Sequence, residues 1–244
     1  MHIENHTATL RGEPDIEIKL RRSRQAKRLN LRVSGLDGRV TLTIPKKLPL
    51  SEALAFLHER ESWLRDAKAR VQVSDRVMIG SDILLRGQRY RIRAAERQRC
   101  ILATDGRLLV PPDPDGQRTG PRLASYFKHC AQNDLLEACD AYSTKLGRRF
   151  TKLSLRDTRS RWGSCSSEGR LMFSWRLIMA PPGVLRYVAA HEVAHLAHMD
   201  HSPAFWACVA RLMPHYQAQR DWLRQNGTQL HSYCFKARPA SENG

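Results

Sequence analysis

The segment His191-Glu192-Val193-Ala194-His195 carries two histidines four residues apart, with a glutamate directly after the first. On a helix, residues four apart differ by about 40° around the axis and by one turn in height, so both imidazoles can face one metal ion. Zinc accepts such nitrogens at about 2.0–2.1 Å. Glu192 lies about 100° around the helix, where it can reach a water at the metal without being a ligand. The spacing therefore predicts hydrolysis by a zinc-activated water with Glu192 as general base.

A catalytic zinc ion takes three protein ligands and keeps one position for water. Three candidates follow the motif, namely His198, Asp200 and His201. On a straight helix His198 would lie about 4.5 Å further along the axis than His195, too far for all three rings to share one ion. His201 precedes Ser202-Pro203, a typical helix start, so the chain turns there and can fold back over the metal. We therefore expect one Zn²⁺ per chain, held by His191, His195 and His201, with Asp200 as a hydrogen-bond partner of a ligand.

A five-residue motif of this kind also occurs by chance. The alternative is a helix whose histidines are partly buried and hydrogen-bonded without a metal. The motif here lies in an apolar helix behind a strand and the Pro181-Pro182 break, and more histidines follow at once, which favours zinc.

The stretch HEVAHLAHMDHSPAFW, with SRWGSCSSEGRLMFSW before it and MPHYQAQRDWL after it, resembles the YgjP-like metallopeptidase domain family. That family is grouped with the SprT/Spartan-type zincins, and the resemblance extends over about residues 17–226. It implies a zincin fold, with Glu192 as base and the same three histidines as ligands. Two features depart from related patterns. The asparagine that the family has before the third histidine is Asp200 here. The HExxH-x5-H spacing equals that of metzincins, but the glycine of their motif is replaced by His198.

The RWGSCS stretch, Arg161–Ser166, precedes the motif helix in the resembling family as a strand, and such edge strands bind extended peptides by β-addition. Arg161 or Ser164 could polarise a substrate carbonyl. Trp162 and Trp175 are interpreted equally well as core aromatics. Beside a zinc site Cys165 is not needed as a nucleophile. Tyr216 could donate its phenol to an oxyanion, although core packing is the competing interpretation.

Alternating apolar residues predict strands over IEIKLRR, LNLRV and VTLTIP, the last two joined by a GLDGR turn, followed by a helix over 51–72. Further strands are expected over ILLRGQRYRIRAAE and in a hairpin around Asp105-Gly106. A long helix over 122–146 ends at Gly147, a strand and a two-stranded hairpin around Glu168-Gly169 follow, and another helix carries the motif as far as His198.

These elements predict an α+β protein with a zincin-like C-terminal domain, which combines a small antiparallel sheet with the motif helix. The segment 111–121 is rich in proline, glycine and aspartate and suggests a linker. The expected organisation is a flexible leader over 1–15, a basic β-rich region with one helix over 16–112, a linker over 113–121, the catalytic domain over 122–235 and a tail over 236–244.

The chain has 244 residues, with 41 Lys and Arg against 24 Asp and Glu, for a net charge of +17. Seven cations and no acid lie between Lys19 and Arg32, and such a field attracts nucleic acid first and anionic membranes second. Solvated arginine-rich faces are the plain alternative. The sequence shows no signal peptide, no apolar run of membrane-spanning length and no CxxC pair among its six cysteines. A cytoplasmic protein is expected.

Three functions compete. The first is a zinc-dependent metallohydrolase, most simply a peptidase acting on protein or peptide substrates. The second is a metal-dependent nucleotide phosphohydrolase, which the cations of 148–161 would suit, although Mg²⁺ chemistry prefers carboxylates to three histidines. The third is a nucleic-acid-associated protein with a structural zinc. Such a site normally has four protein ligands and needs no base such as Glu192.

Overall fold

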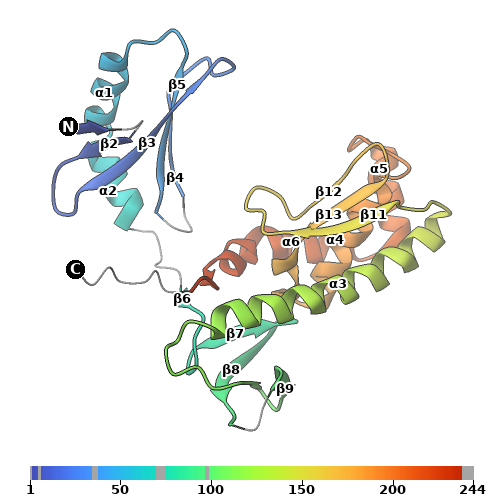
Figure 1. Ribbon diagram of the computed structural model, residues 1–244. Helices are drawn as coiled ribbons and strands as arrows, with labels where there is room; N and C mark the ends of the chain where they lie inside the picture. The colour runs from blue at the N-terminus through green and yellow to red at the C-terminus, as the bar shows by residue number, and fades with distance from the viewer. Residues whose placement is uncertain (1, 5–6, 35–37, 70–74, 97–98, 238–244) are drawn as a thin grey trace. The chain divides into compact units, whose positions relative to one another are not determined.

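The computed structural model describes all residues except 1, 5–6, 35–37, 70–74, 97–98 and 238–244. The chain divides into two compact units, Met1–Ser74 and Asp75–Gly244 (Figure 1). Helices and small mixed sheets occur together, so the α+β class is confirmed. None of the helices in the described part of the chain combines the length and apolar composition that a bilayer crossing requires.

The first unit is a five-stranded sheet covered on one face by two helices. The strands are β1 (His2–Glu4), β2 (Thr7–Leu10), β3 (Ile16–Ser23), β4 (Asn30–Val33) and β5 (Val40–Pro45), in the order β1-β2-β3-β5-β4. Strands β3 and β5 are parallel and the other pairs are antiparallel. Alternate side chains of β2, β3 and β5 are buried against α1 (Leu50–Glu59) and α2 (Glu61–Ala69). The opposite face of the sheet is polar.

Two expectations for this region were wrong. The 1–15 segment is not wholly a flexible leader, because β2 pairs with β3 and buries Ala8 and Leu10 in the core. The single helix expected over 51–72 is two helices separated at Arg60, whose backbone has left the helical conformation (φ −99°, ψ 8°). The end of that expected helix, and the centre of the GLDGR turn, lie outside the described residues.

The second unit begins with β6 (Asp75–Arg76) and a four-stranded sheet of order β7-β8-β10-β9. Its strands are β7 (Asp82–Leu85), β8 (Gln88–Ala94), β9 (Leu102–Thr104) and β10 (Arg107–Val110). Strands β9 and β10 form the expected hairpin, and Asp105 and Gly106 both have positive φ, as the tight turn requires. The Arg86 guanidinium binds Asp134 of the following helix through two hydrogen bonds of 2.8 Å and so ties this sheet to that helix.

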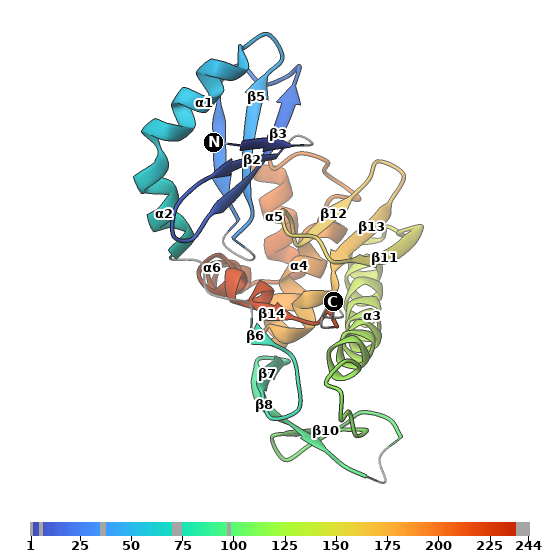
Figure 2. The ribbon, with the colours of Figure 1, turned by 60° about the vertical axis from the view of Figure 1, so that its left-hand side comes forward.

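The long helix α3 (Thr119–Leu146) runs beside the helix α4 (Pro182–Ala194) through the second unit (Figures 1 and 2). Its buried residues recur every three or four positions, as Leu123, Phe127, Ala131 and Leu135 illustrate. Gly147 ends it in the left-handed conformation (φ 71°), as predicted.

The expected linker over 113–121 is not a boundary in this structure. The Asp113 carboxylate accepts hydrogen bonds from the backbone amides of Arg118 and Thr119 at 2.9 and 2.7 Å, and from the Thr119 hydroxyl. It thus satisfies amides at the start of α3 that have no partner within the helix. The segment is therefore part of the second unit, and the chain divides about 40 residues earlier, between Ser74 and Asp75. Most of the expected tail, 238–244, lies outside the described residues.

A three-stranded sheet of order β11-β13-β12 packs beside α4. Its strands are β11 (Lys152–Arg156), β12 (Gly163–Cys165) and β13 (Arg170–Ser174). The β12–β13 hairpin turns at Glu168-Gly169 as expected. The sheet is mixed rather than antiparallel, because β11 runs parallel to β13. A 3₁₀ helix, η1 (Trp175–Met179), follows β13 where a longer strand was expected.

The remaining elements complete the second unit. They are α5 (Pro203–Leu212), α6 (Tyr216–Asn226), a second 3₁₀ helix, η2 (Gly227–His231), and β14 (Tyr233–Cys234). Strand β14 returns to pair in parallel with β6 at the beginning of the unit. The buried Arg176 of η1 binds Asp157 and donates to the carbonyls of Leu230 and Tyr233 at 3.1 Å, which holds the C-terminal segment against the core.

Candidate metal centre

The helix that carries the motif is shorter than expected. It begins at Pro182 and its last regular residue is Ala194, so His195 forms its C-cap. The amides of Ala197 and His198 both donate to the carbonyl of Ala194, which closes a turn instead of continuing the helix. The chain then reaches Ser202, whose hydroxyl accepts a hydrogen bond from the Phe205 amide and caps α5, as predicted. The early end of α4 brings the following segment back over His191 and His195.

Three histidine rings converge at this point. His191, His195 and His201 each offer a ring nitrogen, and these nitrogens all lie within 4.8 Å of one another. The Nε2 atoms of His191 and His201 are 3.2 Å apart. Two nitrogens bonded to a tetrahedral zinc ion at 2.0–2.1 Å would be about 3.3 Å apart. The geometry and the three-imidazole donor set therefore fit a metal ion such as zinc.

The remaining candidates serve other purposes. His198 contributes its backbone carbonyl, which lies 2.9 Å from Nδ1 of His195. When Nδ1 of His195 carries the proton and donates it to this carbonyl, Nε2 keeps the lone pair that can bind a metal. Asp200, expected beside a ligand, instead accepts a hydrogen bond from the Ser202 amide at 3.4 Å.

Aromatic side chains hold the rings in place. Phe205 packs against all three histidines, with centroid distances of 4.5 to 4.9 Å. Trp206 lies 5.7 Å from the ring of His191 and 6.0 Å from that of His201. Nδ1 of His191 is buried without a hydrogen-bond partner among the described residues, so the orientation of this ring comes from packing.

The environment keeps His191 and His195 in the form that binds metals. Burial, together with His195, His201 and Arg220, lowers the pKa of His191 to about 3. Burial also lowers the pKa of His195. Both rings are therefore neutral near pH 7, and a neutral imidazole has the free lone pair that a metal requires.

Glu192 lies on the neighbouring face of α4 and is only 5 % exposed. Burial raises its pKa to about 8, an effect that nearby Arg161 partly opposes. A carboxylate whose pKa lies near the working pH can both accept and return a proton.

Gly163 of β12 is a residue that sequence reasoning missed. A Cβ atom at this position would lie 2.5 Å from Oε1 of Glu192 and 2.6 Å from its Cγ. Only glycine lets the strand approach the carboxylate this closely. The glycine in the RWGSCS stretch was the available signal, but its meaning depends on the packing of β12 against α4.

Most of the other residues singled out in the sequence take part in packing. Trp175 is 1 % exposed and belongs to the core, whereas Trp162 is partly buried and stacks on His231 at 4.8 Å. Burial raises the pKa of the Cys165 thiol to about 11, so it is not a thiolate nucleophile. Tyr216 is 8 % exposed and stacks between Tyr187 and Trp206, which supports the packing interpretation.

Comparisons with known proteins give the family of the chain. Residues 27–226 match the model of a metallopeptidase domain, which gives the class. The particular family is YgjP-like, and because the match extends over most of the chain, the protein belongs to the YgjP-like metallopeptidase domain family, as the sequence motifs predicted. Among solved structures, the metallopeptidase zymogen of Pyrococcus abyssi abylysin matches 38 % of this chain and 93 % of its own, with 19 % identity and a TM-score of 0.34. No curated protein matches the chain.

Proposed function

We propose that this protein is a zinc-dependent peptidase that cleaves amide bonds, with His191, His195 and His201 as metal ligands and Glu192 as general base. The observation that carries the proposal is the convergence of the three ring nitrogens within 4.8 Å at the C-terminal end of α4, the helix that bears Glu192. Membership of a metallopeptidase family supports the same reaction.

A bound Zn²⁺ would supply Lewis-acid chemistry, polarising the substrate carbonyl and acidifying water. The Glu192 carboxylate takes a proton from the attacking water and then returns it to the leaving amine. The raised pKa of Glu192 suits both transfers. Phe205 and Trp206 pack against the histidine rings and fix their orientation.

The substrate would bind along β12. This strand is an edge of its three-stranded sheet and packs against α4. An extended peptide can add to such an edge through backbone hydrogen bonds with little sequence preference. Arg161, which precedes the strand and is exposed, and Ser164 within it are the candidates for contact with the substrate carbonyl.

We further propose a cytoplasmic site of action. Cys130, Cys139 and Cys208 are buried thiols rather than disulfides, as in proteins of reducing compartments.

The test measures metal content and hydrolysis together. Purified wild type should contain one zinc per chain by elemental analysis and should cleave members of a broad peptide library. Glu192→Gln should keep the zinc and lose cleavage by about 10²-fold or more. Glu137→Gln removes an exposed carboxylate on α3 and is the matched control, expected to behave as wild type.

Three results would count against the proposal. Absence of zinc from carefully purified protein would overturn the metal site. Cleavage retained in Glu192→Gln would remove the general base. Hydrolysis of nucleoside triphosphates in place of peptides would move the activity to the phosphohydrolase class.

A further inference from the structure

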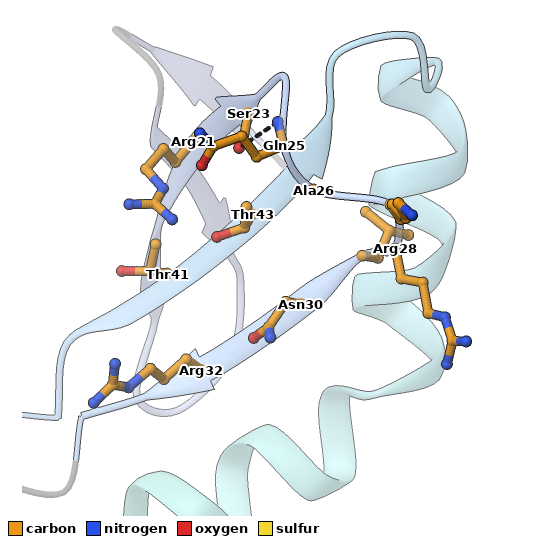
Figure 3. Close-up of a pocket in the computed structure, with 11 residues that line it drawn as sticks. Arg21, Ser23, Gln25, Ala26, Arg28, Asn30, Arg32, Thr41 and Thr43 are labelled. Atoms are coloured by element: carbon orange, nitrogen blue, oxygen red, sulfur yellow. Dashed lines mark hydrogen bonds between the residues drawn. The ribbon is translucent and has the colours of Figure 1, made fainter. Parts of the chain in front are cut away.

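The polar face of the first unit's sheet carries a basic hollow of about 850 Å³. Its walls come from β3, β4, β5 and the loop between β3 and β4 (Figure 3). The lining contains four cations, Arg21, Lys27, Arg28 and Arg32, and none of its eleven residues is acidic. Four of the seven cations that the sequence places between Lys19 and Arg32 therefore line one hollow.

The strand register arranges these groups in rows. Thr43 of β5 pairs with Arg21 of β3 on one side and with Asn30 of β4 on the other. One row along, Thr41 pairs with Lys19 and Arg32 in the same way. Because alternate residues of a strand point to the same face, both rows point away from the buried core residues Val40, Leu42 and Ile44. Figure 3 shows Arg21, Thr41, Thr43, Asn30 and Arg32 on one side of the three strands.

The cations of the hollow are not used in holding the fold together. Arg22, whose side chain points to the other side of β3, donates to the carbonyls of Lys46 and Leu48 at 3.0 Å. By contrast, Arg21 and Arg32 are exposed and make no hydrogen bond or ion pair with the residues that the structure describes. Their guanidinium groups remain available to an anionic ligand.

The composition of the hollow indicates which anion it fits. Its polar side chains are arginine, lysine, serine, threonine, asparagine and glutamine, the set that contacts phosphate and sugar in nucleic-acid complexes. No aromatic ring lines it for base stacking. Insertion into a membrane surface would require exposed large hydrophobic side chains on this face. In the described part of the first unit, the exposed large hydrophobic side chain is Trp63, which lies on α2 and not in the hollow.

We propose that this face of the first unit, lined by Arg21, Lys27, Arg28 and Arg32, binds the phosphodiester backbone of a nucleic acid without sequence preference. The interaction is electrostatic, with a dissociation constant of about 10⁻⁴–10⁻⁶ M at physiological salt. The residues that would bind it all belong to the first unit, whereas the candidate metal centre belongs to the second.

The test is fluorescence anisotropy of a labelled single-stranded 20-mer of mixed sequence, titrated with the full chain between 50 and 200 mM KCl. Four phosphate contacts predict a slope of log K against log salt of about −2.8, and the Arg21→Gln/Arg32→Gln double variant should reduce it to about −1.4. The matched control, Arg60→Gln/Lys68→Gln, removes the same charge from the helical side of the unit and should keep the wild-type slope. Arg60 lies between α1 and α2, Lys68 lies on α2, and these helices cover the opposite face of the sheet. Thermal melts of both variants show that they are folded.

A second 20-mer of different sequence should bind equally well. Equal slopes and affinities for the two double variants would overturn the proposal, because binding would then lie elsewhere on the chain. Capture of the protein by phosphatidylserine vesicles, without binding to the oligonucleotide, would also overturn it and assign the face to a membrane surface.

Discussion

The close approach of Gly163 to Glu192 leads to a specific prediction for Gly163→Ala. The added methyl carbon would lie 2.5 Å from Oε1, 2.6 Å from Cγ and 2.8 Å from Cδ of Glu192. The optimal van der Waals separation between non-bonded heavy atoms is about 3.5 Å, so the carboxylate or the strand has to move by about 1 Å. Glu192 is buried, so it has little room in which to move without disturbing α4.

A displacement of about 1 Å at a catalytic group costs on the order of 100-fold in rate, equivalent to about 2.7 kcal/mol of transition-state stabilisation. We expect Gly163→Ala to lower kcat/KM by about this factor. The clash is with the side chain of Glu192 and with none of the three histidines, so the zinc content should not change. Crowding in the core should also lower the free energy of unfolding by about 1–3 kcal/mol.

The assay is peptide hydrolysis at matched zinc occupancy, with a thermal melt to show that the variant is folded at the assay temperature. Gly183→Ala is the control, because its methyl carbon would meet the side-chain amide of Gln219, which can move aside. The reasoning is refuted if folded, zinc-loaded Gly163→Ala keeps kcat/KM within about twofold of wild type.

Three other perturbations have defined outcomes. Chelation should lower the Tm of wild type, and added zinc should restore it, whereas His201→Ala should show little response; equal responses by differential scanning calorimetry would contradict the ligand assignment. In metal-free protein, burial raises the folded-state pKa of Glu192 to about 8 from an ordinary 4.5. Between these two pH values Glu192 is ionised in the unfolded chain but still protonated in the folded one, so the free energy of unfolding falls as the pH rises. In urea unfolding, the free energy of unfolding of metal-free Glu192→Gln should therefore rise relative to that of wild type between pH 5 and pH 8, by on the order of 3 kcal/mol. A difference that stays constant with pH would argue against the raised pKa. Arg176→Leu should destabilise the protein by about 2–4 kcal/mol in urea, because the carbonyls of Leu230 and Tyr233 lose their donor; a change below about 1 kcal/mol would mean that water replaces it.

Local features of the fold and the site could be predicted from the sequence. The spacing of His191 and His195 depends only on helix geometry, and the Ser202 cap and the Gly147 stop depend on one residue each. The expectation that His201 lies near the other two was correct in its geometry, because the helix start at Ser202-Pro203 forces a turn.

Features that depend on distant contacts could not be predicted in the same way. The capping of α3 by Asp113 made a proline- and glycine-rich segment part of the second unit, although its composition is that of a linker. The end of α4 at Ala194 has no glycine or proline to mark it, since the next residues are His195 and Leu196. Gly163 acquires its importance only when β12 packs on α4.

The pairing of β14 with β6 has a consequence for the modularity of the chain. Tyr233 aligns with Asp75, and the Val77 amide donates to the Cys234 carbonyl at 3.0 Å, so the first and last described strands of the second unit are neighbours. A folding unit whose two ends meet tolerates being inserted into another chain or cut open at a new place. A circular permutant that joins 237 to 75 through a short linker and opens at the exposed turn of Pro114 and Asp115 would keep all three histidines and Glu192 in one continuous segment. The metal centre would then be retained in a protein that begins and ends somewhere else.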